Sequence, residues 1–216
     1  MKRREFIKSA AAGIGGLSVL GARGQSAAAA KKPLRVALIG CGGRGCGELL
    51  PELCKERVVA LADPDRRCIE ASLAKVAKTA ASMDVTAIQT FSDYRKLFDA
   101  MGKELDAVVI ATPNHQHAPP ALLAMRRGIH AYVEKPLTHT IADARLLRDE
   151  AKRTGVVTQM GQHGHSNEGC RRLCEYIWAG AIGQVHEVHC WTSRCDGLYD
   201  GHHSPALPLP AGFDWD

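Results

Sequence analysis

Three glycines in the spacing GxGxxG begin the part of the chain that could do chemistry. They are Gly40, Gly42 and Gly45, and they follow an apolar run without a spacer. In this pattern the first glycine permits a tight turn, the second lets backbone approach a pyrophosphate, and the third lets the next helix pack closely on the strand. The unpaired N–H groups at the start of that helix favour phosphate. The loop, which also holds Gly43 and Arg44, is therefore predicted to bind a dinucleotide.

A carboxylate stands where the ribose of such a ligand would need one. Asp63 ends the second apolar run, 18 residues after the last glycine of the loop, which is about the separation expected for a ribose-binding acid. A carboxylate there favours NAD, because it would repel the 2′-phosphate of NADP. Arg66 and Arg67 lie close enough to favour NADP instead, unless they belong to a solvated first turn of the next helix. We expect NAD, with NADP as the alternative.

A lysine and a glutamate follow a later apolar run, at residues 130–133. Oxidation of a secondary alcohol requires a hydride to leave carbon while a base removes the hydroxyl proton. An ammonium near the alcohol oxygen stabilises a developing alkoxide, so Lys135 is a candidate catalytic and substrate-binding residue. Glu134 and Lys135 are both expected to contact the cofactor. The structural alternative is an ion pair between Glu134 and a helix end, with Lys135 in solvent.

Two loops after predicted strands supply further polar candidates. The expected cofactor contacts in the first loop are Thr112, Pro113, Asn114 and His117, of which the histidine would contact the nicotinamide ribose or the substrate. Gln162 and His163 follow the last predicted strand and are expected to face the substrate at the mouth of the cleft. Their alternative is a loop that closes onto a helix.

Histidines and cysteines near residue 165 invite a zinc hypothesis, which we reject. The four possible ligands are His163, His165, Cys170 and Cys174. The two cysteines are one helical turn apart, which is common in cores, and the histidines fall where the cofactor is expected. We therefore predict no metal site.

Apolar runs alternate with helical patterns along the chain, which predicts a doubly wound parallel sheet of the α/β class. Strands are predicted at residues 34–39, 58–62, 87–90, 106–111, 130–133 and 156–160. Helices are predicted at 46–55 with a kink or late start at Pro51, at 65–81, at 92–98 with Ser92 as the N-cap, at 119–127, at 140–154 ending at Gly155, and at 167–179.

The domain prediction follows from these elements. Residues 32–155 are predicted to form a Rossmann NAD(P)-binding domain. Residues 156–216 would hold its last strand, a linking helix and the start of a second α/β domain with an open sheet. The first strand of that sheet is expected at 185–192. No closing element precedes Asp216, so we expect this second domain to be truncated.

The first 30 residues resemble a twin-arginine (Tat) signal peptide. Arg3 and Arg4 precede a weakly hydrophobic segment at 9–22 and then small residues at 27–30 that suit signal peptidase. The apolar part is too short and too rich in glycine for a stable membrane span. We expect export by the Tat machinery to the periplasm or another extracytoplasmic site. The alternative is a disordered basic tail.

Composition excludes other classes of partner. The formal net charge of the 216 residues is +5, and most of it lies in the leader, so nothing indicates a nucleic-acid surface. The eight cysteines are scattered through predicted strands, helices and the glycine loop, which disfavours an oxidised framework.

Four motifs occur in order at strand ends, and together they resemble the Gfo/Idh/MocA oxidoreductases, the family of glucose-fructose oxidoreductase and inositol dehydrogenase. They are GCGGRG at 40–45, Asp63, ATPNHQH at 111–117 and YVEKPL at 132–137. The resemblance covers residues 32 to about 192. It implies a tightly bound nicotinamide cofactor, a sugar, cyclitol or related polyol as substrate, and Lys135 at the reaction centre.

The resemblance also implies parts that lie beyond Asp216. A histidine and an aspartate of the second domain would complete the site, and association through that domain would make a homo-oligomer. Some relatives are glycoside hydrolases that use NAD for transient oxidation and elimination, and this activity stays an alternative to net oxidation. A third hypothesis is a module that binds a nucleotide and catalyses no reaction.

Overall fold

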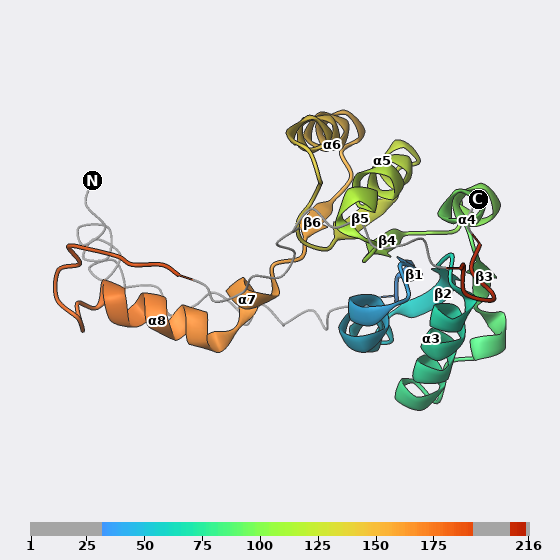
Figure 1. The fold of residues 1–216 in the computed structure, drawn as a ribbon, viewed down its shortest axis with the longest axis horizontal. Helices are drawn as coiled ribbons and strands as arrows, with labels where there is room; N and C mark the ends of the chain where they lie inside the picture. Colours follow the sequence, from blue (N-terminus) through green and yellow to red (C-terminus); the bar gives the residue numbers. More distant parts are fainter. Residues whose placement is uncertain (1–31, 192–207, 215–216) are drawn as a thin grey trace, which may run out of the picture. The chain divides into compact units, whose positions relative to one another are not determined.

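Six strands form a single parallel sheet in the computed structural model, which describes residues 32–191 and 208–214 (Figure 1). The strands are β1 (Arg35–Ile39), β2 (Arg57–Ala62), β3 (Gln89–Phe91), β4 (Ala107–Ile110), β5 (His130–Val133) and β6 (Thr158–Met160). Their order is β3-β2-β1-β4-β5-β6, and every neighbouring pair is parallel. The predicted doubly wound α/β sheet is confirmed.

Helical segments connect these strands, and further helical segments follow β6. They are η1 (Gly45–Leu49), α2 (Leu50–Leu53), α3 (Arg66–Thr79), η2 (Val85–Ala87), α4 (Tyr94–Met101), η3 (Asn114–Gln116), α5 (Ala118–Arg126), α6 (Ile141–Thr154), α7 (His163–Ser166) and α8 (Glu168–Trp178). The helix expected after the glycine loop begins as the π-helical turn η1. Pro51 then lies in the first turn of α2, where the hydrogen bonding changes from π-helical to α-helical.

Two apolar cores cover the two faces of the sheet. Successive residues of β1 alternate between them, as the pleat of a strand requires. Val36 and Leu38 pack with α2 and α3, whereas Ala37 and Ile39 pack with α4, α5 and α6 (Figure 1). The four inner strands β2, β1, β4 and β5 are therefore largely buried on both faces, which explains why their sequences read as nearly continuous apolar runs.

Helix α4 begins one residue later than predicted. The Asp93 carboxylate accepts the backbone N–H of Arg95 over 2.7 Å, so Asp93 is the N-cap and the prediction of Ser92 is wrong. An aspartate and a serine are about equal as N-caps, and local preference does not decide between neighbours. Ser92 instead donates its hydroxyl to the Asp214 carboxylate over 2.5 Å.

The strand expected at 185–192 is not found at residues 185–191, and Thr192 lies outside the described residues. The alternation of polar and apolar side chains there is real. A strand also needs backbone partners, however, and no described residue pairs with this stretch. The prediction of a second sheet therefore stays untested beyond this one segment. The leader at 1–30 also lies outside the described residues.

Within the described residues, no helix has the length and apolar character needed to cross a bilayer. The cysteines of the same residues are free thiols.

The cap of α4 generates a stability prediction. Replacing Asp93 by alanine leaves the Arg95 N–H without its partner and should lower the free energy of unfolding by about 1 kcal/mol. Urea unfolding measures the change, with Asp149→Ala, which removes an exposed carboxylate inside α6, as the control. Equal losses in the two variants would contradict the assignment of the cap.

Candidate active site

The predicted site residues come together because four strands end at one edge of the sheet. Parallel strands present their carboxyl ends on the same side. The glycine loop follows β1, Asp63 follows β2, the loop 112–117 follows β4, and Glu134 follows β5. The Gly40 N–H donates to the Ala62 carbonyl over 2.8 Å, which ties the start of the glycine loop to the end of β2.

The glycine loop forms a cradle that side chains would fill. A Cβ on Gly45 would lie 2.0 Å from the Gly40 carbonyl oxygen, and a Cβ on Gly40 would lie 2.6 Å from the Ala111 carbonyl carbon. Gly40 also has a φ of +90°. By contrast, a Cβ on Gly43 would meet nothing within 4 Å. The loop therefore packs closely at its ends and is open at its middle, which fits a pyrophosphate against bare backbone.

A groove of about 530 Å³ runs along the same loop. It is lined by Gly42 and Gly43 of the loop and by Asp65 and Arg67 at the start of α3. Cys41, Cys46 and Cys68 add thiols to its wall, and burial raises the pKa of the Cys68 thiol. Backbone N–H groups that can donate and a carboxylate that can accept hydrogen bonds together suit a nucleotide.

Asp63 is held in place by backbone. One carboxylate oxygen accepts the Cys41 N–H over 2.7 Å, and the other accepts the Asp65 N–H over 2.8 Å. A carboxylate oxygen has two acceptor positions, so each oxygen can still accept a hydroxyl proton. The half-buried carboxylate of Asp63 is thus fixed at the end of β2 with acceptor capacity left for a diol.

The two arginines that followed Asp63 in the sequence lie in the exposed first turn of α3. Arg66 Nε lies 3.0 Å from Glu70 Oε1, and Arg67 contacts both oxygens of Asp65, at 2.6 and 2.9 Å. The hydrogen bond from Arg67 lowers the pKa of Asp65. This is the solvated helix turn given above as the alternative to an NADP site.

Glu134 links the glycine loop to the strand that carries Lys135. Its side chain is 6% exposed, and its Oε1 lies 3.1 Å from Arg44 Nε. The N–H at that nitrogen is buried without a directed hydrogen bond to described residues, so the contact is an ion pair. Tyr132 donates its hydroxyl to Glu134 over 3.3 Å. Burial and then the Glu134 charge raise the pKa of the Tyr132 phenol.

Lys135 is exposed at the end of this strand. Its backbone N–H donates to Glu134 Oε2 over 3.3 Å. Both parts of the structural alternative are therefore present, since Glu134 pairs with Arg44 at the start of a helix and Lys135 faces solvent. The same geometry also leaves the ammonium free for a substrate, so its catalytic role stays a prediction.

His117 joins two loops of the site. The side chain is 1% exposed, with Nε2 at 2.8 Å from the Thr112 carbonyl oxygen and Nδ1 at 2.6 Å from the Pro136 carbonyl oxygen. It therefore connects the loop after β4 to the turn that contains Lys135. The predicted contact with cofactor or substrate stays a prediction.

The remaining predicted residues lie on short helical turns or directly before them. Pro113 and Asn114 are exposed at the start of η3, and Thr112 donates its hydroxyl to the Gln116 carbonyl over 2.9 Å. Gln162 precedes α7, and His163 Nδ1 lies 3.9 Å from Glu48 Oε2 of η1. His163 therefore reaches the helix that follows the glycine loop.

Tyr132 is a residue of the site that was not predicted from the sequence. Tyr132 and Glu134 are two positions apart on one strand, so their side chains point to the same face. That spacing could have placed the hydroxyl beside the carboxylate. The described residues hold no cluster of three or more His, Cys, Asp or Glu side chains around a metal position.

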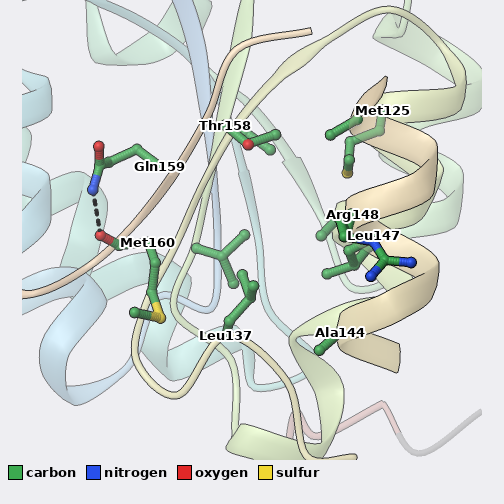
Figure 2. A pocket seen from close by; sticks show the side chains of 12 residues that line it. Met125, Leu137, Ala144, Leu147, Arg148, Thr158, Gln159 and Met160 are labelled. Atoms are coloured by element: carbon green, nitrogen blue, oxygen red, sulfur yellow. Dashed lines mark hydrogen bonds between the residues drawn. The ribbon is translucent and has the colours of Figure 1, made fainter. Parts of the chain in front are cut away.

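A separate apolar pocket lies between α5, α6 and the last two strands (Figure 2). It has a volume of about 130 Å³, and Met125, Leu147 and Met160 contribute to its wall. The Gln159 amide near it donates to the Met160 carbonyl over 2.7 Å. Of its lining residues only Leu137 belongs to a strand-end loop of the candidate site, and the others lie on helices and strands, so we assign the pocket no part in nucleotide binding.

Comparison with known proteins identifies the nucleotide domain. The family model for Gfo/Idh/MocA proteins, described as "Oxidoreductase family, NAD-binding Rossmann fold", matches residues 34–162. This range contains the glycine loop, Asp63 and Lys135. The domain is therefore an NAD-binding Rossmann domain, and the predicted cofactor class is confirmed.

Individual relatives match beyond that range. The chain is 30% identical over 163 residues to inositol 2-dehydrogenase 4 of Saccharopolyspora erythraea, covering 74% of the chain and 45% of the relative. It is 31% identical over 206 residues to a glycosyl hydrolase family 109 protein of Shewanella pealeana, covering 86% and 44%. The chain thus spans less than half the length of these relatives.

A solved structure supports the fold. The myo-inositol 2-dehydrogenase of Lactobacillus plantarum superposes with a TM-score of 0.59 at 24% identity, covering 71% of this chain and 43% of that one. At this identity the likeness concerns the fold alone.

The cradle generates a prediction about two glycines of one helix. Gly45→Ala forces a methyl group against the Gly40 carbonyl and should lower the free energy of unfolding by about 2 kcal/mol or more. A Cβ on Gly47 would meet nothing within 4 Å. Gly47→Ala should therefore leave the free energy of unfolding unchanged or raise it by up to about 1 kcal/mol. Chemical unfolding of both variants measures the difference. Equal effects would contradict the close approach.

Proposed function

This chain belongs to the Gfo/Idh/MocA family of oxidoreductases, and we propose that it oxidises a secondary alcohol of a sugar, cyclitol or related polyol with NAD. The observation that carries the proposal is the gathering of the glycine cradle, Asp63 and Lys135 at one edge of the sheet. The inositol dehydrogenase among its relatives supports the substrate class. NADP remains the alternative cofactor.

Each part of the edge has a task in this proposal. When bound, the nicotinamide supplies the hydride acceptor. The cradle binds the pyrophosphate through backbone N–H groups, and the Asp63 carboxylate accepts hydrogen bonds from the ribose hydroxyls. Lys135 stabilises the developing alkoxide of the substrate or takes part in moving its proton.

Glu134 and His117 act as positioning residues in this account. Glu134 contacts Arg44 of the glycine loop and the backbone N–H of Lys135. His117 contacts the carbonyl oxygen of Pro136, the residue after Lys135. The backbone at Lys135 and Pro136 is thus held by contacts with Glu134 and His117. These contacts limit the directions that the Lys135 ammonium can take.

A glycoside hydrolase is the second candidate activity. The family 109 relative matches 86% of this chain, more than the inositol dehydrogenase does. Such an enzyme would use NAD transiently and regenerate it, so no NADH would accumulate. A panel of polyols and glycosides distinguishes the two: net formation of NADH supports the dehydrogenase, and sugar release without NADH supports the hydrolase.

The role of Lys135 is tested on the full-length protein. Lys135→Met should lower kcat by about 100-fold or more, because the group at the alcohol oxygen is lost, while the Kd for NAD stays within about threefold. Lys78→Ala, an exposed lysine of α3, is the control and should leave both quantities unchanged. Normal turnover by the Lys135 variant would refute its catalytic role.

We also propose that the protein is exported through the Tat pathway. The support is the paired Arg3 and Arg4 before a weakly apolar segment. Export would place the protein in the periplasm or another extracytoplasmic site. Separately, we propose that the whole protein is a homo-oligomer.

Export is tested by changing the paired arginines. Replacing both Arg3 and Arg4 by lysine keeps the charge and removes the Tat signature, so the protein should accumulate in the cytoplasm with its leader attached. Cell fractionation with detection of the mature and precursor forms measures this. Unchanged export of the double variant would show that the route is not Tat.

A further inference from the structure

Residues 208–214, here called the return segment, lie against the turn that follows β2 (Figure 1). The Asp214 N–H donates to the Pro64 carbonyl oxygen over 2.8 Å. In the opposite direction, the Arg66 N–H donates to the Gly212 carbonyl oxygen over 3.1 Å. The two hydrogen bonds hold both sides of the turn that begins with the ribose-binding acid.

Two further contacts anchor the return segment. Phe213 pairs with Asp65 in an antiparallel bridge between the two hydrogen bonds. The Ser92 hydroxyl, directly after β3, donates to the Asp214 carboxylate over 2.5 Å. The return segment therefore connects the ends of β2 and β3, and the proposed function uses none of these contacts.

The return segment shares a pocket with the ribose-binding carboxylate. Asp63, Ser92 and Gly212 line one cavity of about 470 Å³. Ligand atoms beside Asp63 would therefore meet the return segment as well as the end of β2.

The donors that a phosphate would need near this turn are already engaged. The Arg66 guanidinium contacts Glu70, and its backbone N–H donates to Gly212. The Arg67 guanidinium contacts both oxygens of Asp65. Because the Gly212 carbonyl takes the first free N–H of α3, this helix start offers less to an anion than an uncovered one would.

Negative charge exceeds positive charge around the turn. The turn and the side chains in contact with its neighbours hold five carboxylates, of Asp63, Asp65, Glu70, Asp93 and Asp214, and four cations, of Arg66, Arg67, Arg95 and Lys96. A 2′-phosphate carries close to two negative charges at neutral pH, whereas a ribose diol is neutral and donates hydrogen bonds. The turn therefore suits the diol.

We propose that the return segment is part of the nucleotide site and selects NAD over NADP. The Gly212 carbonyl occupies a backbone donor that a 2′-phosphate would otherwise use, and the Asp214 carboxylate adds a negative charge beside the pocket. Asp214 is thus a specificity-determining residue at a distance of 151 positions from Asp63 in the chain. The inference rests on the proposed function, since it takes the nucleotide to lie along Asp63.

The test measures the Kd values of NAD and NADP by titration calorimetry on the full-length protein. The wild type should bind NAD at least about tenfold more tightly than NADP. Asp214→Asn keeps an oxygen for the Ser92 hydroxyl and removes the charge, so NADP should bind about fivefold more tightly while NAD changes less than twofold. Asp214→Lys, at an exposed position, should increase the gain for NADP further.

Asp149→Asn is the matched control, because it removes an exposed carboxylate of α6 that contacts Arg148. It should leave both Kd values unchanged. A wild type that prefers NADP, or an Asp214 variant in which both affinities change equally or neither changes, would overturn the inference and leave the proposed function standing. If the wild type binds neither nucleotide, the proposed function itself fails.

Discussion

The candidate site depends on the close approach of backbone at the glycine loop. Gly45 lies so near the Gly40 carbonyl, and Gly40 so near the backbone of Ala111, that no side chain fits at either position. This approach places the loop after β1 directly against the loop after β4. Everything else at the carboxyl edge is built onto that contact, because the residues of both loops take their positions from it.

Side chains then tie the remaining loops to this backbone contact. Asp63 accepts hydrogen bonds from Cys41 of the glycine loop and from its own turn, and Glu134 pairs with Arg44 of the same loop. His117 connects the loop after β4 to the turn after β5. These polar groups are buried or half-buried with partners, which makes them costly to displace. Lys135 is exposed at the edge that these contacts connect.

Most of the fold could be predicted from the sequence, because buried parallel strands leave continuous apolar runs and helices leave caps. The central strands and α6, with Thr140 as its N-cap and Gly155 in the left-handed conformation, follow these local rules. The short edge strand β3 is less apolar, and it begins two residues and ends one residue later than predicted. Ser92 and Asp93 are both good caps, so the sequence alone does not choose between them; Asp93 caps the helix and Ser92 contacts Asp214.

The contacts of the site that the sequence did not predict have one feature in common. They join residues that are far apart along the chain. The types and spacing of residues placed the glycine loop, Asp63 and Lys135 at strand ends. They could not show that Glu134 meets Arg44, that His117 bonds two carbonyl groups, or that residues 208–214 return to the end of β2. Alternation alone also predicted a strand at 185–192 that residues 185–191 do not form, since pairing needs a partner that the pattern does not reveal.

The central claim is that a dinucleotide lies across this edge with its ribose on Asp63. The affinity of the full-length protein for NAD, measured before and after Asp63→Asn, tests it most directly. The account predicts binding by the wild type and a loss of about tenfold to a hundredfold in the variant, as expected when hydrogen bonds to a charged group are removed. Equal affinities in two proteins of similar thermal stability, or no binding by the wild type, would contradict it.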